Sequence, residues 1–300
     1  MESEYKVLER NNDYAKRKDY WEIAKGLQES DYLKTSEYLE TVIEDTVAGK
    51  YDTLEAVKRV DSYYDSESSD AGTAEADKSA ARITAALENS AFKFSPVTLR
   101  VLHKQIFDGV FPDEWVGVYR SVNLTKEEPV LCGRSVQYAD WSMIEDTLRY
   151  DFDEQARVRY HLPFDSDQVS KLVRFTSNIW QTHPFREGNT RAVATFTIMR
   201  LQSMGVDIDN TPFKENAQYF RDALVRANYA SLRDGIDEDD SFLTMFFENV
   251  LTGANHDLSA VDLRCPELYK MKNREQQLRD ASKAYNDEHP HEPTDRGEER

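Results

Sequence analysis

The chain has 300 residues, and its 38 Lys and Arg against 56 Asp and Glu give a formal net charge of −18 at pH 7. This acidic balance argues against broad docking on nucleic acid or on an anionic membrane, so any anionic ligand needs a local site. No run approaches the roughly 18 apolar residues of a membrane span, and the first residues lack a signal-peptide pattern. The two cysteines, Cys132 and Cys265, are isolated and form no disulfide framework or zinc signature. We therefore expect a cytoplasmic protein that binds neither nucleic acid nor membrane.

Residues 1–65 are predicted to form a small helical unit. Three stretches with apolar residues at helical spacing begin near Trp21, after Ser36 and after Asp52. The acidic, serine-rich sequence DSYYDSESSDAG follows and is typical of a linker. We therefore place a domain boundary near residues 65–72.

The larger part of the chain, residues 73–252, is also expected to be mainly helical. Two β-rich runs, 115–122 and 130–138, predict one hairpin within it. Further helices are expected after Ser95, from a cap at Ser166 to a point before Pro184, from about Asn189, and over about 215–230 and 241–251. Residues 253–300 are expected to hold a C-terminal helix and a disordered acidic tail. The predicted fold is thus a mainly α helical bundle with one β-hairpin and a small N-terminal helical unit.

The most informative segment reads HPFREGNTR, from His183 to Arg191, and lies between two of these helices. A glycine turn before a helix start presents free backbone N–H groups and the positive end of the helix dipole, which favour a phosphate. Glu187 adds an oxygen ligand that Mg²⁺ accepts beside substrate phosphates, and Arg191 adds a forked cationic contact. A histidine, with an ordinary pKa of about 6.5, can take a proton from a hydroxyl near neutral pH. These groups suit a nucleotide-dependent transferase. The plain alternative is a structural histidine beside a surface ion pair of Glu187 and Arg191.

The same segment resembles the signature of the Fic family, HxFx[D/E]GNGRxxR, whose members transfer AMP from ATP to a hydroxyl side chain of a target protein. Six fixed positions match, namely His183, Phe185, Glu187, Gly188, Asn189 and Arg191. The likeness extends over about residues 96–250, so it implies a Fic-type helical core there. It also implies ATP as substrate, Mg²⁺ as the accompanying metal and a protein with an acceptor hydroxyl as partner.

Carried over by position, the resemblance gives individual residues roles. His183 is the base and Glu187 the magnesium ligand, while the nucleotide is bound by Arg186, Gly188, Asn189, Thr190 and Arg191. Phe185 is expected to anchor the loop in the core. In the family a hairpin before the motif is a flap that holds the target segment by strand pairing. It maps here to roughly residues 122–130, with Asn123, Leu124, Thr125 and Lys126 as the residues that dock the target.

Two positions depart from the family pattern. Thr190 stands where the family has a third glycine, and Ala194 stands where it has a second arginine. In the family that arginine meets the terminal phosphate and pairs with an inhibitory glutamate, so both functions are open here. A non-glycine residue at position 190 also resembles the Doc branch, which transfers the γ-phosphate. Besides AMP transfer, a Doc-like protein phosphotransferase and a catalytically weak, nucleotide-binding toxin–antitoxin module therefore remain as alternatives.

The sequence WEIAKGLQESDYLKTSEYL, residues 21–39, resembles the small antitoxin partner of Fic toxins, fused in cis. The resemblance implies an inhibitory motif [S/T]xxxE[G/N], whose acidic residue falls at Asp31. A more literal match runs from Thr84 to Asn89 and contains Glu88. Asp31 and Glu88 are therefore both candidate inhibitory residues, and removal of residues 1–65 is expected to raise activity. The target protein, the nucleotide specificity and the oligomeric state stay open.

Overall fold

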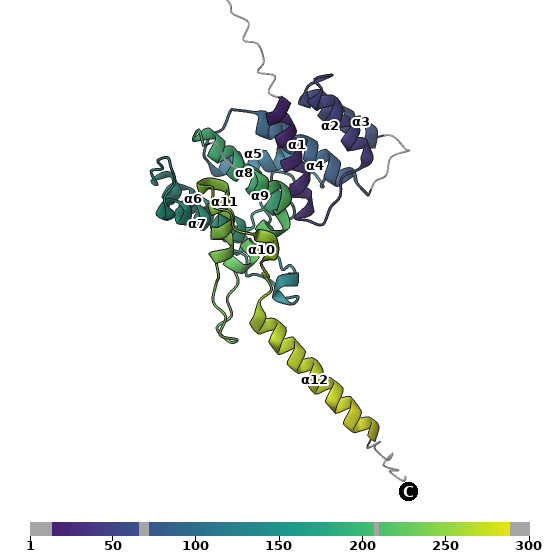
Figure 1. The fold of residues 1–300 in the computed structure, drawn as a ribbon, viewed down its shortest axis with the longest axis vertical. Coiled ribbons are helices and arrows are strands. Elements are labelled where there is room, and N and C mark those ends of the chain that lie inside the picture. The colour runs from purple at the N-terminus through teal and green to yellow at the C-terminus, as the bar shows by residue number, and fades with distance from the viewer. Residues whose placement is uncertain (1–13, 66–71, 207–209, 289–300) are drawn as a thin grey trace, which may run out of the picture.

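The computed structural model describes residues 14–65, 72–206 and 210–288, and these ranges are mainly helical with no β-strand among them (Figure 1). The expectation of a mainly α fold is confirmed. The α-helices are α1 (Tyr14–Glu29), α2 (Glu37–Val47), α3 (Thr53–Tyr64), α4 (Ala74–Glu88), α5 (Pro96–Phe107), α6 (Ile144–Ala156), α7 (Ser166–Thr182), α8 (Asn189–Ser203), α9 (Thr211–Glu215), α10 (Ala217–Ala227), α11 (Ser241–Thr252) and α12 (Pro266–Glu288). Short 3₁₀ turns lie at Pro129–Leu131, Trp141–Met143 and Leu258–Ala260.

Helix starts follow the capping residues of the sequence closely. Ser36, Asp52 and Ser95 are the N-caps of α2, α3 and α5, and each side chain accepts a hydrogen bond from the N–H three residues on. The cap of α7 is Asp165 rather than Ser166, because Asp165 and Gln168 form a reciprocal capping box. The expected cap at Ser166 was therefore wrong by one residue.

The expected β-hairpin does not form strands. One isolated antiparallel bridge joins Glu128 to Arg134, and between them a 3₁₀ turn begins at Pro129 and Cys132 adopts a left-handed conformation, with φ 60°. On the N-terminal side the Arg120 N–H donates to the carbonyl of Pro184 at 2.8 Å instead of to a partner strand. The two runs therefore pack against the loop that follows α7, and the flap is an irregular segment.

The N-terminal helices share one apolar core with the rest of the chain. α1 packs against α4 and α9, and α4 in turn packs against α3, α5 and α8 (Figure 1). Trp21 and Leu27 are fully buried in this core. At Gly26 a side chain would lie 2.3 Å from the carbonyl oxygen of Lys214, so α1 and α9 approach closely. The division at residues 65–72 stays a prediction, and residues 66–71 lie outside the described ranges.

The C-terminal helix α12 extends away from the helical body (Figure 1). Its first turn is fixed by Leu268, which is buried, and by the Tyr269 hydroxyl, which donates to the carbonyl of Pro129 at 2.7 Å. The acidic tail predicted beyond it lies outside the described residues. Among the described helices, none combines the length and the apolar character that crossing a membrane requires.

Candidate active site

The loop between α7 and α8 is a tight corner held by its own side chains. His183 is the C-cap of α7 in a left-handed conformation, with φ 47°, and Gly188 is the N-cap of α8, with φ 73°. The Asn189 side chain closes the corner, because its Oδ1 accepts from the Phe185 N–H at 3.0 Å and its Nδ2 donates to the Phe185 carbonyl at 2.9 Å. The Asn189 amide group is thus occupied in shaping the loop.

Packing of the loop against α5 determines which residues fit at two of its positions. A side chain at Gly188 would bring Cβ within 2.4 Å of the Phe107 ring, so only glycine fits there. Phe185 is fully buried, as expected of an anchor, and stacks on the His103 ring with centroids 3.8 Å apart. The loop therefore sits directly on α5.

His103 fixes the loop from below, a role that sequence reasoning missed. Its Nδ1 accepts from the Gly117 N–H at 3.0 Å, so its Nε2 carries the proton and donates to the Glu187 carbonyl at 3.0 Å. Burial lowers the pKa of His103 to about 4, which keeps the ring neutral near pH 7. The signal in the sequence was a histidine on the apolar face of α5, which alone does not reveal its partners.

His183 is a buried, neutral imidazole at the end of α7. Its ring stacks on Tyr138 with centroids 3.9 Å apart and meets the Trp180 ring edge-on. Burial, together with the positive charge of Lys126, lowers its pKa to about 3. Nδ1 lies 3.3 Å from the Trp180 carbonyl, which can only accept, so Nδ1 carries the proton and Nε2 keeps its lone pair. The ring is therefore neutral near pH 7, with the acceptor lone pair on Nε2.

Arg120 holds the backbone around His183 and was also missed. It is buried, and its Nε donates to the His183 carbonyl at 2.7 Å. Its terminal nitrogens donate to the carbonyls of Val122, Ala139 and Thr182. A single arginine thus ties the flap segment to the end of α7, and nothing in the local sequence VGVYRS indicates this role.

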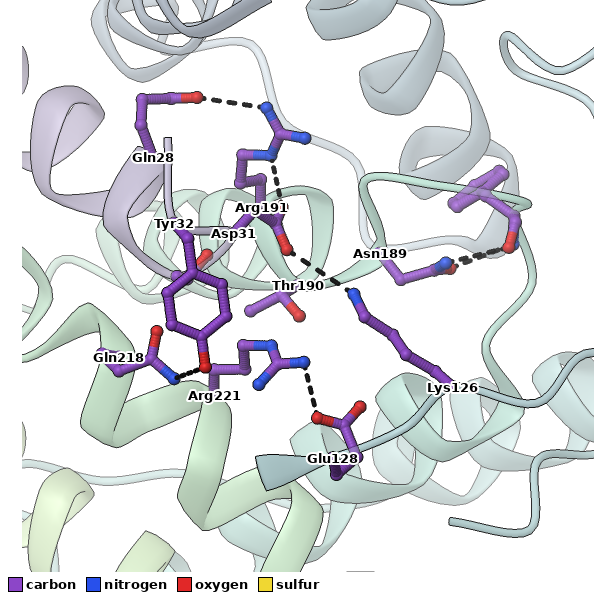
Figure 2. Close-up of polar contacts among 12 residues, drawn as sticks. Gln28, Asp31, Tyr32, Lys126, Glu128, Asn189, Thr190, Arg191, Gln218 and Arg221 are labelled. Carbon is purple, nitrogen blue, oxygen red and sulfur yellow. Dashed lines mark hydrogen bonds and ion pairs between the residues drawn. The ribbon is translucent and has the colours of Figure 1, made fainter. Parts of the chain in front are cut away.

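Arg191, one turn into α8, is enclosed by the N-terminal helices (Figure 2). Its Nε lies 2.8 Å from Asp31 Oδ2, without the alignment of a hydrogen bond. One terminal nitrogen donates to Gln28 Oε1 at 3.1 Å and to Ser79 Oγ at 3.3 Å, and the other donates to Glu75 Oε1 at 2.6 Å. The guanidinium is therefore paired with α4 and with the end of α1.

A cavity of about 200 Å³ lies beside the loop, below the roughly 300–1,000 Å³ typical of ligand pockets. It is lined by Asp31, Leu124, Thr125, Lys126, Tyr138, His183 and residues 186–190. The structure thus brings the predicted base, the magnesium ligand, most of the nucleotide-binding residues, three flap residues and Asp31 to one cavity. Lys126 Nζ lies 3.9 Å from Asp31 Oδ1 across it (Figure 2).

Three of the predicted residues that line this cavity have further contacts or a shifted pKa. Thr190 turns its hydroxyl to Trp180, accepting from the indole Nε1–H at 3.0 Å. The Arg186 guanidinium lies over the Trp115 ring at 5.1 Å. Burial and the nearby carboxylates of Asp31 and Glu75 raise the pKa of Glu187, although Lys126 opposes them.

Two predicted residues lie elsewhere. Glu88, at the end of α4, pairs with Arg17 at 3.1 Å and does not line the cavity, so the structure does not bring it to the loop. Asn123 does not line the cavity either, because its amide binds Asp140 and the backbone N–H of Trp141. Of the two candidate inhibitory residues, only Asp31 reaches Arg191.

A fully buried ion pair supports the flap segment. Arg221 Nη2 on α10 lies 2.6 Å from Glu128 Oε2, and their side chains are 2% and 0% exposed (Figure 2). Glu128 Oε1 and the Tyr138 hydroxyl are both buried without a hydrogen-bond partner. The pair therefore fixes the segment that carries Tyr138, the ring on which His183 stacks.

The donor set decides what kind of metal the cavity can hold. Within the described ranges no three His, Cys, Asp or Glu side chains cluster as a metal cage. Glu187, with carboxylates nearby, can supply one oxygen ligand. Such a site suits a hard cation whose remaining ligands are mostly phosphate oxygens and water. Mg²⁺ carried by a nucleotide fits this donor set.

Residues 93–201 match the Fic/DOC family, and this range contains α5, most of α8 and the whole loop between His183 and Arg191. The chain therefore carries a Fic/DOC domain, and the helical fold agrees with that of the family.

Two named proteins are similar to the chain. The protein adenylyltransferase VbhT of Bartonella schoenbuchensis is 26% identical over 118 residues, which are 39% of this chain and 23% of that protein. The probable protein adenylyltransferase y4lH of Sinorhizobium fredii is 30% identical over 131 residues, which are 43% of this chain and 62% of that protein. The chain thus matches less than two thirds of the length of either relative.

Proposed function

We propose that the chain is a protein adenylyltransferase that moves AMP from ATP to a serine, threonine or tyrosine hydroxyl of another protein. The observation that carries the proposal is the neutral His183 imidazole, with Nε2 free, in a cavity that also holds Glu187 and the start of α8. The names of both relatives support the same activity here.

In the proposed reaction His183 Nε2 accepts the proton of the target hydroxyl. The hydroxyl oxygen forms a bond to the α-phosphorus, the bond from that phosphorus to the bridging oxygen breaks, and pyrophosphate leaves. Backbone N–H groups at the start of α8 stabilise the charge on the phosphates. Glu187 would hold Mg²⁺ brought by ATP, which neutralises phosphate charge. Arg191, once released from Asp31, would add a forked contact.

The target segment is proposed to dock on the flap. Leu124, Thr125 and Lys126 line the cavity that His183 also lines, so a hydroxyl presented there would meet the base. Because the flap has no regular strand, we expect side-chain contacts to contribute beside any backbone pairing.

The N-terminal helices are proposed to hold the enzyme in a closed state. Asp31 and Glu75 occupy the guanidinium that would bind phosphate, and the cavity is small for a nucleotide. Deletion of residues 1–65 would also strip fully buried residues such as Trp21 and Leu27 from the core. Point variants of Asp31 and Glu75 are therefore the sharper test of inhibition.

The Doc-like alternative transfers the γ-phosphate. It is favoured by the side chain of Thr190, which stands in the loop where the family has a glycine. Ala194 is buried and supplies no cation for a terminal phosphate, which favours the third candidate instead. The third candidate is a module that binds a nucleotide without turnover.

One experiment separates the three. The full chain is incubated with a target-rich lysate and ATP labelled at either the α- or the γ-phosphate. AMP transfer retains only the α-label on protein, whereas phosphorylation retains only the γ-label. Nucleotide binding without either label supports the module. His183→Ala is the control, and full labelling by this variant would remove the proposed base.

A further inference from the structure

A second cavity lies near the far end of α8, about nine residues along the helix from Arg191. Its volume is about 670 Å³, within the range of roughly 300–1,000 Å³ that ligand pockets occupy. It lies between the last turns of α8 and the segment that joins α6 to α7. Its walls include Phe94, Tyr160, Phe164, Arg200, Ser203 and Met204. None of the residues predicted for the loop site lines it.

Arg200 is the unusual member of this wall. The residue is 6% exposed, and its Nε is buried without a hydrogen-bond partner. Within the described residues it forms no ion pair. An arginine keeps its proton in a protein, so this cavity wall carries a full positive charge with no negative charge beside it.

The other buried arginines of the described chain all have oxygen partners. Arg191 and Arg221 pair with carboxylates, Arg120 donates to several carbonyls, and Arg226 donates to the Leu263 carbonyl and lies near Asp239. Arg200 differs because its polar neighbour is the neutral hydroxyl of Tyr160 and no described carboxylate pairs with it, in a chain with an excess of 18 negative charges. Although the chain has many carboxylates, none of the described ones forms an ion pair with this guanidinium.

Aromatic rings hold the Arg200 guanidinium in place. Its central carbon lies 3.6 Å from the centroid of the Phe94 ring, and the rings of Phe175 and Tyr160 lie at 5.6 and 5.8 Å. Such contacts stabilise a cation and fix its plane, but they supply no counter-charge. Burial lowers the pKa of Arg200, and the Tyr160 hydroxyl offsets part of that effect. The cost of the buried charge is therefore only partly compensated by the protein.

We propose that this cavity binds a small organic anion whose single carboxylate or phosphate pairs with Arg200 and whose aromatic body lies against Tyr160, Phe164 and Met204. The planar guanidinium matches both anions in a forked geometry. The apolar walls match an aromatic ring better than an inorganic ion. The site is separate from the loop site, so this proposal can be tested independently of the proposed transferase activity.

The probes are benzoate and phenyl phosphate, with benzyl alcohol as the uncharged analogue. Binding to the full chain is measured by ligand-observed NMR, and the ¹⁵Nε resonance of Arg200 is followed in the same samples. Benzoate or phenyl phosphate at millimolar concentration is expected to bind and to shift that resonance, whereas benzyl alcohol leaves it unchanged. Excess ATP is expected not to displace the probe.

Ser203 provides a variant pair that spares the core. It lines the cavity, is exposed, and donates to the Arg200 carbonyl at 2.7 Å. Ser203→Glu places a negative charge at the mouth and is expected to weaken binding about fivefold or more, whereas the matched Ser203→Gln, which loses the same hydrogen bond, binds as the wild type does. Arg200→Gln is expected to abolish binding. No binding of either anion, displacement by ATP, an unmoved Arg200 resonance, or equal affinity in the two Ser203 variants would each overturn the proposal.

Discussion

Asp31 Oδ2 lies 2.8 Å from Nε of Arg191, which joins the end of α1 to the first turn of α8. Glu75 holds another nitrogen of the same guanidinium from α4. The resemblance to the family implied that an inhibitory acid would pair with a second arginine, but that position is Ala194. Here the acid is paired with the first arginine instead. The N-terminal helices thus contact the very residue that is proposed to bind phosphate.

Releasing Arg191 should raise transferase activity. We expect Asp31→Asn combined with Glu75→Gln to raise the rate of label transfer roughly tenfold or more, because a change of about 1.4 kcal/mol in the closed state shifts its population tenfold. Labelling from α-labelled ATP measures the effect. Glu88→Gln is the matched control, since Glu88 pairs with Arg17 and should leave the rate unchanged. An unchanged rate in the folded double variant would contradict inhibition by these carboxylates.

Gly188 should be intolerant of any side chain. Gly188→Ala lowers the stability because alanine disfavours a positive φ by about 1–2 kcal/mol, and because its Cβ would lie 2.4 Å from the Phe107 ring. Gly205→Ala is a close control, because its φ is also 73° but a side chain there meets nothing within 4 Å. Urea unfolding should therefore show a larger loss of stability for Gly188→Ala than for Gly205→Ala. Equal losses would mean that the ring moves aside without cost.

Local signals in the sequence sufficed for much of the helical fold and for the loop. Caps such as Ser36 and Asp52 act within one turn, so they can be identified without knowledge of distant contacts. The contact of Glu75 with Arg191 spans 116 residues, and no local pattern indicates it. The prediction of a hairpin was wrong for a related reason. The residues with strand propensity pack against the loop after α7 instead of pairing with one another.

The two buried histidines should make the protein sensitive to acid. The pKa values of His103 and His183 are lowered to about 4 and about 3, against about 6.5 in the unfolded chain. Below pH 6.5 the unfolded state therefore binds protons that the native state does not, and stability falls as the pH falls toward 4. The loss is on the order of 1 kcal/mol per pH unit for each histidine.

Urea unfolding at pH 7 and pH 5 checks this expectation. His103→Gln keeps one acceptor and one donor and should reduce the loss of stability between the two pH values. His161→Gln changes an exposed histidine and should leave that loss as in the wild type. If the His103 variant loses as much stability as the wild type, burial of that ring is not the cause of the sensitivity.

Replacing only one partner of the Glu128–Arg221 ion pair should strongly reduce the stability of the protein. Both side chains are buried, so Glu128→Gln removes the shorter ion pair of Arg221 and leaves its charge with only the contact to Asp222 at 3.3 Å, and the expected loss is up to about 3–5 kcal/mol in urea unfolding. Adding Arg221→Met removes the buried, poorly compensated charge and should restore part of that loss. Asp262→Asn breaks an exposed pair with Arg264 and should have no measurable effect. A double variant no more stable than Glu128→Gln alone would mean that the two residues act through separate contacts. In that case the ion pair would not hold the segment that packs against His183.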